Sequence, residues 1–368
     1  MSSSARATAG FETTKPTAAP ASLFGPLPGA LEDAAVTARL EAVLDAVLGR
    51  GAPDIMAAVI TPLGAWSGAA GVGGADRRPA TVEDAYYIGA ISQIFTAATI
   101  VRLAEEGSVD LDAPLADYLG DLAVDTNGAT VEEALAHRSG LSDFPPETAD
   151  AIRADPARRW TPEEVVGHFV APTSSPGDRY LLAGPNYSLL AAAAQGAAGT
   201  SFAKAMRTTI LDPVGATRIV TQGEDEVTPK PWALPIAAQA GAFELEDYGA
   251  GGVISCMSSV SFSRGYGAVA ADAPSLASWI WHFFAGDLVD AESLRLMLPG
   301  SDGHGFGFDV LTDMGSDTVI GQIGSKPEYS AILAIWPIEQ TVAVVFVNDL
   351  EFIIDPVAVE LRDVATDH

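Results

Sequence analysis

Apolar residues recur along the chain at two different spacings, and the change of spacing divides the chain into regions. Over residues 31–48 they follow the period of an amphipathic helix, which Gly51 ends. Residues 55–60 and 65–72 instead carry short apolar runs with a turn between them, a pattern typical of a hairpin. The pattern therefore predicts that the folded part of the chain begins with one helix and two strands.

Helical spacing dominates from Ala90 to about Thr221, and strand-like spacing returns after a proline-rich, acidic stretch at 223–232. Four strand-like segments follow at hairpin spacing, over residues 304–310, 318–323, 329–336 and 341–347. A last helix is expected at 356–364. We predict three regions: a flexible tail over residues 1–30, an α/β lobe from 31–89 and 241–368, and a helical lobe over 90–240 inserted between its two parts.

The composition narrows the class of protein. Hydrophobic residues make up 48% of the 368 and charged residues 18%, which is typical of a globular protein. The net charge of −28 gives a surface that repels nucleic-acid phosphates and anionic lipids, so we expect neither as a partner. Residues 1–28 lack the pattern of a secretory signal, and no apolar stretch reaches membrane-spanning length. These features favour a cytoplasmic protein.

One segment carries most of the functional information. It runs over residues 87–98 (YIGAISQIFTAA) and leads into a helical pattern that ends at 103–112 (LAEEGSVDLD). This block resembles the active-site segment of the serine β-lactamase and penicillin-binding-protein superfamily, including its esterase and D-aminopeptidase relatives. Residues 130–141 (TVEEALAHRSGL) and 200–217 resemble two further blocks in the same order. The resemblance implies an α/β fold, with an antiparallel sheet flanked by helices and an inserted all-helical lobe.

In the superfamily that this segment resembles, a Ser is acylated and a Lys one helical turn later helps to deprotonate it. Here Ala90 stands at the Ser position and Gln93 at the Lys position. Ser92 is the nearest hydroxyl, but two residues along a helix it faces roughly the opposite side. One turn after Ser92 come Phe95 and Thr96, and neither is a base. We interpret Ser92 as a hydroxyl that hydrogen-bonds locally.

The second motif of that superfamily is Tyr-x-Asn, whose Tyr shuttles a proton and whose Asn holds the substrate amide. The matching stretch places Leu182 at the Tyr and Gly184 at the Asn. Tyr180 and Asn186 each lie two residues from a motif position, which changes the direction they face unless an insertion shifts the register. For His137, near the end of the 130–141 block, the resemblance implies a structural role.

The third motif, Lys-Thr-Gly or His-x-Gly, lies on a strand that lines the site. Here Gln322 replaces the Lys or His, Gly324 is kept, and Glu328 stands where the superfamily usually has a glycine. All three motifs have lost their reactive groups together, although losing one such group already costs a hydrolase about a million-fold in rate. We predict that the chain is not a conventional serine hydrolase.

The groups that remain in the cleft favour an uncharged pocket, because amides donate and accept hydrogen bonds without charge. The residues expected to line it are Ala90, Gln93, Leu182, Gly184, Gln322 and Gly324. The residues expected to bind a neutral or amide-bearing small molecule are Gln93, Gln322, Tyr329 and Lys326. We predict either binding alone or a non-covalent reaction, such as a cyclisation or isomerisation in specialised metabolism. We expect no metal or other cofactor, since metal-ligand spacing and phosphate-binding loops are missing from the sequence.

Two other functions stay open at this point. A serine hydrolase or acyltransferase could use relocated residues, such as Ser92, or Ser325 with Lys326. Alternatively, the pocket is vestigial and the chain is an interaction protein. A covalent adduct with a fluorophosphonate or penicillin would favour the hydrolase, and a filled, collapsed cleft would favour the interaction protein.

Overall fold

The computed structural model describes residues 22–73, 78–224, 230–233, 252–311, 314, 318–326 and 329–367 of the chain. Within these ranges a six-stranded antiparallel sheet has the order β2-β1-β9-β8-β7-β6. Two of its strands come from the beginning of the chain and four from its end, which confirms the predicted fold class. The strands are β1 (Asp54–Thr61), β2 (Gly64–Gly71), β6 (Asp309–Val310), β7 (Ile320–Lys326), β8 (Tyr329–Trp336) and β9 (Thr341–Val347).

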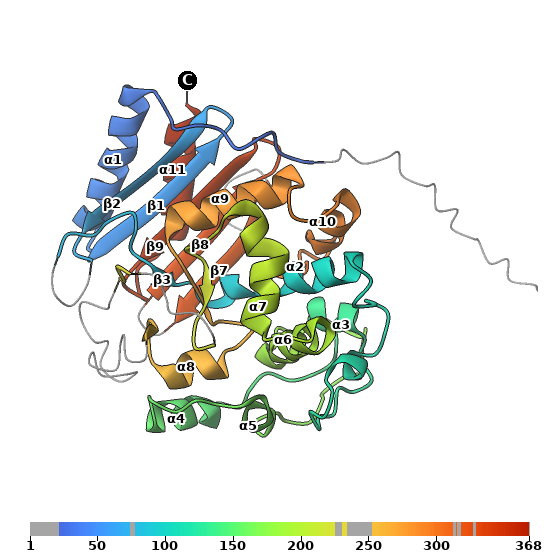
Figure 1. Ribbon diagram of the computed structural model, residues 1–368. Helices are drawn as coiled ribbons and strands as arrows, with labels where there is room; N and C mark the ends of the chain where they lie inside the picture. The colour runs from blue at the N-terminus through green and yellow to red at the C-terminus, as the bar shows by residue number, and fades with distance from the viewer. Residues whose placement is uncertain are drawn as a thin grey trace, which may run out of the picture.

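Helices cover both faces of the sheet, so its inner strands are apolar on both sides. In β1, Met56 and Ile60 belong to the larger core, whereas Ile55 and Val59 belong to the smaller one. Because successive side chains of a strand point to opposite faces, burial on both faces gives a continuous apolar run rather than an alternating one. Helices α1 (Ala34–Gly49) and α11 (Asp355–Thr366) pack together on one face, and α9 (Ala273–Ala285) crosses the other (Figure 1).

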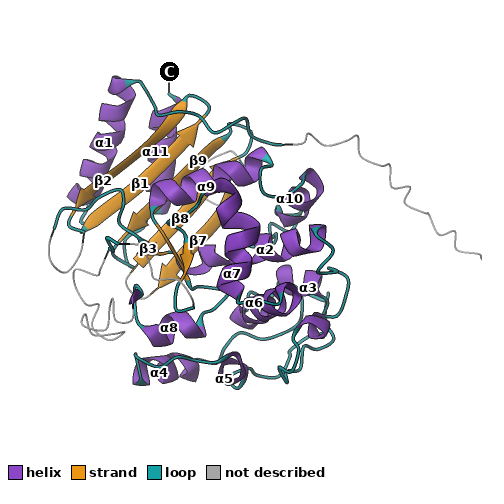
Figure 2. Cartoon of the chain, in the orientation of Figure 1, coloured by secondary structure: helices purple, strands orange, loops and turns teal. Residues whose placement is uncertain are grey.

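The other helices gather beyond one end of the sheet, as Figure 2 shows. The α-helices are α2 (Ser92–Glu105), α3 (Val131–Leu135), α4 (Glu147–Ala154), α5 (Pro162–Val166), α6 (Gly184–Ala198), α7 (Phe202–Met206), α8 (Met257–Phe262) and α10 (Ala291–Met297). Shorter turns of helix are η1 (Gly89–Ile91), η2 (Leu115–Tyr118), η3 (Arg207–Leu211) and η4 (Asp212–Val214). A small second sheet joins β3 (Tyr86–Tyr87), β5 (Val269–Ala271) and β4 (Val220–Thr221).

The predicted end of the helical lobe at residue 240 lies outside the described residues. On either side of that gap, α8 packs against α4, and α10 packs against α2. Helices that follow the gap therefore contact the region predicted as the helical lobe.

The strand predicted over 304–310 is much shorter than expected, since only β6 forms there. The residues before it make a turn in which Gly307 has a φ of +79°. A Cβ on Gly307 would lie 2.9 Å from the Ile94 Cα, so only glycine fits this close contact with α2. The turn therefore presses against the first turn of the helix that carries Gln93, and the two segments form one wall of the candidate site.

Candidate functional site

The turn that carries Ala90 lies directly against β7. Residues 89–91 form η1, and Gly89 has a φ of +55°, a backbone conformation that residues with a side chain rarely adopt. A Cβ on Gly324 would lie 1.9 Å from the Ile88 carbonyl oxygen, so this position too requires glycine. The close contact brings Gly324 next to Ala90, and it leaves Ala90 partly exposed.

The outer edge of β7 is open beside this contact. β6 pairs with Ile320 and Gly321, and no further strand of the described chain pairs with that edge. Gln322 and Gly324 share the face of β7 that looks toward the helical lobe, because their partners on β8 belong to the larger core. The open strand edge, the Ala90 turn and this face of β7 together mark the position of the cleft predicted from the sequence.

Gln93 belongs to a closed group of side chains, here called the inner network, which comprises Gln93, His137, Asn186 and Ser139. Gln93 is 4% exposed, and its Oε1 lies 2.9 Å from Nε2 of His137. Nδ1 of His137 lies 3.3 Å from the backbone nitrogen of Ala183 and 3.2 Å from Nδ2 of Asn186. The Ser139 hydroxyl donates to Oδ1 of Asn186 at 2.6 Å. The network joins α2 to the start of α6 through the chain between α3 and α4.

The bonding in the inner network fixes where its protons lie. The Ala183 N–H can only donate, so Nδ1 of His137 accepts and the ring proton is on Nε2. That proton is donated to Oε1 of Gln93, which sets the orientation of the amide. The amide nitrogen of Gln93 then has no hydrogen-bond partner among the described residues. Gln93 thus offers two N–H donors that the described residues leave unused.

Burial keeps His137 uncharged. It lowers the pKa of His137 from its usual 6.5 to about 3, and the nearby charge of His304 lowers the pKa further in the same direction. At any pH near neutrality His137 is therefore a neutral hydrogen-bonding residue rather than a proton carrier. This is the kind of structural role that the family resemblance implies for His137.

A second group, here called the outer network, comprises His304, Asp309, Gln322 and Tyr180. Nδ1 of His304 lies 2.8 Å from Oδ1 of Asp309, and the Gln322 amide nitrogen donates to Oδ2 of Asp309 at 3.2 Å. The same Gln322 nitrogen donates to the Gly307 carbonyl at 3.3 Å, and its Oε1 accepts from the Ile323 N–H at 3.0 Å. The Gln322 amide is therefore used within the protein, where it holds Asp309.

Tyr180 links the two networks by ring contacts. Its ring stacks on His304 with centroids 3.6 Å apart and an angle of 5°, and it meets His137 edge-on at 5.8 Å. Burial, followed by the negative charges of Asp309 and Asp302, raises the pKa of Tyr180 well above 10, so its hydroxyl stays protonated. A neutral Tyr, a neutral His137 and an oriented His304 thus lie together at one side of the cleft.

The residues aligned with the second motif, Leu182 and Gly184, do not form the apolar wall that the sequence predicted. Leu182 is 53% exposed in the loop before α6, so it provides no buried apolar wall. Gly184 is the first residue of α6, and its N–H donates to Asp143 at 2.9 Å. Asn186 is fully buried and points into the inner network. Of the two displaced residues, only Tyr180 is partly exposed at the site.

The relocated serines also have clear positions. Ser92 is fully buried, and its hydroxyl accepts the Val269 N–H at 3.0 Å. The predicted local hydrogen bond is therefore wrong, because the partner lies on β5, far along the chain. Ser325 is exposed on β7. Tyr329 is 1% exposed, and its hydroxyl donates to the Ala233 carbonyl, which directs it away from a ligand. The Lys326 side chain and Glu328 lie outside what the structure describes.

Sequence reasoning missed His304 and Asp309 as site residues. It placed both on one predicted strand, where residues five apart point to opposite faces. The local signal was the pair of glycines between them, Gly305 and Gly307, since glycines inside a strand pattern often mark a bend or a close backbone approach. The turn that these glycines permit brings the histidine back onto the carboxylate.

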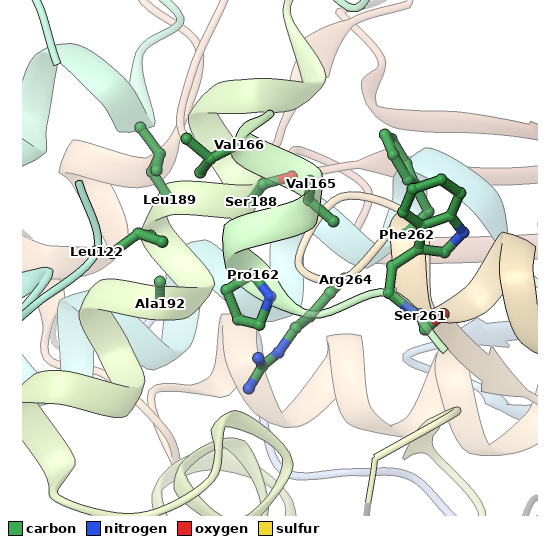
Figure 3. Close-up of a pocket in the computed structure, with 11 residues that line it drawn as sticks. Leu122, Pro162, Val165, Val166, Ser188, Leu189, Ala192, Ser261, Phe262 and Arg264 are labelled. Carbon is green, nitrogen blue, oxygen red and sulfur yellow. Dashed lines mark hydrogen bonds between the residues drawn. The ribbon is translucent and has the colours of Figure 1, made fainter. Parts of the chain in front are cut away.

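A separate cavity of about 20 Å³ lies between α5, α6 and α8 (Figure 3). It is lined mainly by apolar side chains such as Leu122, Trp160 and Val165, and the Ser188 hydroxyl beside it has no hydrogen-bond partner in the described part of the chain. This volume fits one water molecule and no larger ligand. Ser188 and Asn186 are two residues apart on α6, so the cavity lies on another face of that helix than the inner network.

The described ranges do not meet the requirements of a metal site or of a membrane-spanning helix. No three His, Cys, Asp or Glu side chains gather there as metal ligands would. None of the helices in these ranges is long and apolar enough to cross a bilayer.

Comparisons with known proteins agree with this architecture. A family model described as beta-lactamase matches residues 34–361. A crystal structure of D-amino acid amidase from Ochrobactrum anthropi SV3 complexed with L-phenylalanine amide is similar at a TM-score of 0.76 and 20% identity, over 91% of this chain and 99% of that chain. The octameric penicillin-binding protein homologue from Pyrococcus abyssi is similar at a TM-score of 0.71 and 22% identity, over 89% of this chain and 77% of that chain. A D-stereospecific amidohydrolase from Streptomyces sp. is similar at a TM-score of 0.68 and 21% identity, over 85% of this chain and 94% of that chain.

Proposed function

Because the chain belongs to the beta-lactamase family, we propose that it uses the family's cleft to hold a small, neutral, amide-bearing molecule without forming a covalent bond to it. The observation that carries this proposal is the pair of residues at the start of α2. Ala90 offers a methyl group, which cannot be acylated, and Gln93 offers an amide, which cannot deprotonate a nucleophile.

The free N–H donors of Gln93 support the choice of an amide or other carbonyl compound. Its oxygen is occupied by His137, so the group left for a ligand is a donor, and a carbonyl oxygen is the matching acceptor. The donor carries no charge, and His137 beside it is neutral, so the inner network contains no cation that would require a charged ligand. Gln322 contributes through Asp309 rather than by direct contact.

The structural neighbours support the size of the proposed ligand. One neighbour, D-amino acid amidase, is described in complex with L-phenylalanine amide and with D-phenylalanine. At 20% identity such a likeness supports the fold, and it makes phenylalanine amide a reasonable probe rather than an expected substrate.

The two other functions have weaker support. Hydrolysis by relocated residues would need a free nucleophile beside a base, but Ser92 is buried and bonded to the Val269 N–H. A vestigial site would need both amides to bond only to backbone, whereas Gln93 bonds to His137 and Gln322 bonds to Asp309. We therefore place ligand binding first, with turnover by a non-covalent reaction as its extension.

The proposal is tested by measuring the affinity for D- and L-phenylalanine amide by ligand-observed NMR, together with intact mass after exposure to penicillin and to a fluorophosphonate. We expect binding and no covalent adduct. The Gln93→Glu variant keeps an acceptor for His137 but loses the N–H donors, so it should bind the amide at least about tenfold more weakly, which corresponds to one lost hydrogen bond. Ala90→Leu should weaken binding by filling the cleft.

Ser325→Ala is the matched control, since Ser325 is exposed on the same strand and belongs to neither network. It should leave the affinity unchanged. A serine-dependent covalent adduct would support the hydrolase instead. Failure of both enantiomers of the amide to bind would contradict the proposed ligand class and favour the interaction protein.

A further inference from the structure

The outer network contains a histidine, His304, whose ring is held in one orientation although only one of its two nitrogens is bonded among the described residues. Asp309 holds Nδ1 of His304 at 2.8 Å, which places the ring proton on Nδ1 and leaves Nε2 as the acceptor. Nε2 of His304 has no partner among the residues that the structure describes, and the side chain is 34% exposed. Asp309 is itself held by Gln322, and the flat face of the imidazole is held by Tyr180.

Each of these contacts fixes a different freedom of the ring. The carboxylate fixes the tautomer and the direction of the Nδ1 edge, and the stacked phenol fixes the plane. The backbone N–H of His304 is held by Asp302, whose carboxylate also pairs with Arg138. A surface histidine needs none of this support, so the arrangement points to a group whose orientation matters.

Resting on the proposed function, we propose that His304 is the general base of the cleft and that it removes a proton from the carbon next to the carbonyl of the bound amide. Asp309 and Gln322 act as positioning residues for His304. The inner network supplies the complementary donor, because the free Gln93 amide is suited to hold the carbonyl oxygen on which negative charge then develops.

The step balances within the substrate and the side chain. The C–H bond breaks, and its proton goes to Nε2 of His304, which becomes an imidazolium paired with Asp309. The electron pair forms a C=C bond, and the carbonyl π pair moves onto the oxygen. Return of a proton from His304 to the same face restores the amide with exchange of the hydrogen, and delivery of a proton by water to the opposite face inverts the carbon. Neither outcome requires a redox partner. This places the reaction among isomerisations by proton transfer.

The first test needs no variant. Diethyl pyrocarbonate transfers an ethoxycarbonyl group to accessible, neutral imidazole nitrogens, and peptide mass spectrometry locates it. We expect His304 to react at neutral pH and to be protected by saturating phenylalanine amide. His282 on α9 is the matched control, because its Nδ1 lies 2.7 Å from Asp287, which follows that helix, and its side chain is also partly exposed. It should react without protection. An unreactive His304, or one whose reactivity ignores the amide, would overturn the proposal.

The second test measures the chemistry directly. The full chain is incubated with D- or L-phenylalanine amide in D₂O, and loss of the α-hydrogen signal is followed by ¹H NMR. We expect enzyme-dependent exchange in the wild-type protein, a loss of at least about 100-fold in His304→Gln, and an unchanged affinity for the amide. The control His282→Gln should exchange like the wild type.

Asp309→Asn tests the positioning role. It should slow exchange less than His304→Gln does, and the ¹⁵N chemical shifts of His304 should show the loss of a single tautomer, a change that a merely structural carboxylate would not cause. Binding of the amide without exchange would overturn the general base while leaving the proposed function intact. Absence of both binding and exchange would overturn the two together.

Discussion

Two histidines contact the Tyr180 ring, and they have opposite environments. His137 is 3% exposed, and both of its nitrogens are bonded within the protein. The side chain of His304 is 34% exposed, and one of its nitrogens is bonded. The same side chain therefore serves as a neutral structural bridge at His137 and as an oriented imidazole with one unbonded nitrogen at His304, among the described residues.

The difference shows that burial and the number of fixed nitrogens decide what a histidine can do. A histidine with both nitrogens occupied in an apolar setting cannot exchange protons without breaking the structure around it. A histidine whose second nitrogen is free can accept a proton and keep its place. The chemistry open to a histidine is thus better judged by its unbonded nitrogens than by its residue type.

The largest contrast is expected in stability. His137→Ala removes the partner of Gln93, Ala183 and Asn186 at once, so it should lower the free energy of unfolding by about 2–4 kcal/mol. His304→Ala should lower it by less than about 1 kcal/mol, because its side chain is partly solvated. Urea unfolding monitored by tryptophan fluorescence measures both. Equal losses would show that the two networks do not differ as described.

Restoring the family's pair of reactive residues tests the inner network from the other direction. Ala90→Ser with Gln93→Lys places an ammonium group opposite the Nε2–H of His137 in a site that is 4% exposed, so roughly 2 kcal/mol of stability should be lost. Hydrolysis of nitrocefin and p-nitrophenyl esters should stay at the uncatalysed background if, as the resemblance implies, Leu182 and Gly184 stand at the positions of the proton shuttle and the substrate clamp. Efficient turnover would mean that Tyr180 supplies the missing proton transfer.

The pH dependence of stability separates His137 from a second buried group, Asp54. Burial raises the pKa of Asp54 from 3.8 to about 7, although bonds from Tyr86 and Asn348 oppose the rise. Folded Asp54 keeps its proton where unfolded Asp54 loses it, so its contribution to stability falls as pH rises from about 4 to 7. His137, with a pKa of about 3, has the opposite slope between about 3 and 6.5.

The two slopes oppose one another over about pH 4–6.5, so Asp54→Asn should expose the slope of His137. Relative to the wild type, stability of the variant should increase more steeply with pH, by up to ~1.4 kcal/mol per pH unit for one proton. Urea unfolding at several pH values measures this. Parallel profiles for the two proteins would show that Asp54 is ionised in the folded state across this range.

The smallest expected effect belongs to Ser92. Ser92→Ala leaves the buried Val269 N–H without its acceptor, so it should cost about 1 kcal/mol of stability and change no hydrolytic activity. Ser325→Ala, on the exposed strand, should change neither. Esterase activity that disappears in Ser92→Ala would contradict the structural reading of that hydroxyl.

Much of the fold was predictable because its signals are local. The apolar run at β1, the glycines at the ends of helices, and the order of the matching blocks all predict elements without knowledge of distant contacts. The approach of Ala90 to Gly324 was also predictable, since the family's order of motifs implies it. The bonded state of Gln93 was not, because its partner His137 comes from a separate block.

The outer network was beyond the reach of the sequence for a physical reason. Tyr180 and His304 are distant along the chain, and a stacking contact between two rings leaves no periodic pattern in either segment. The turn at Gly307 replaced an expected strand, because a left-handed glycine allows closer packing against α2 than a strand would. The close contact between the two backbones therefore determined the local structure here, and the alternation of side chains did not.

Gly307 has one further consequence for the cleft. Its missing side chain sets the spacing between the segment that carries His304 and Asp309 and the helix that carries Gln93. A single methyl group there would act as a spacer, because it would lie 2.8 Å from the Ile94 nitrogen and push the two walls apart. The lack of a side chain at Gly307 therefore sets the distance between the two walls of the proposed cleft. Substitutions at this one position offer a way to change which molecules bind there.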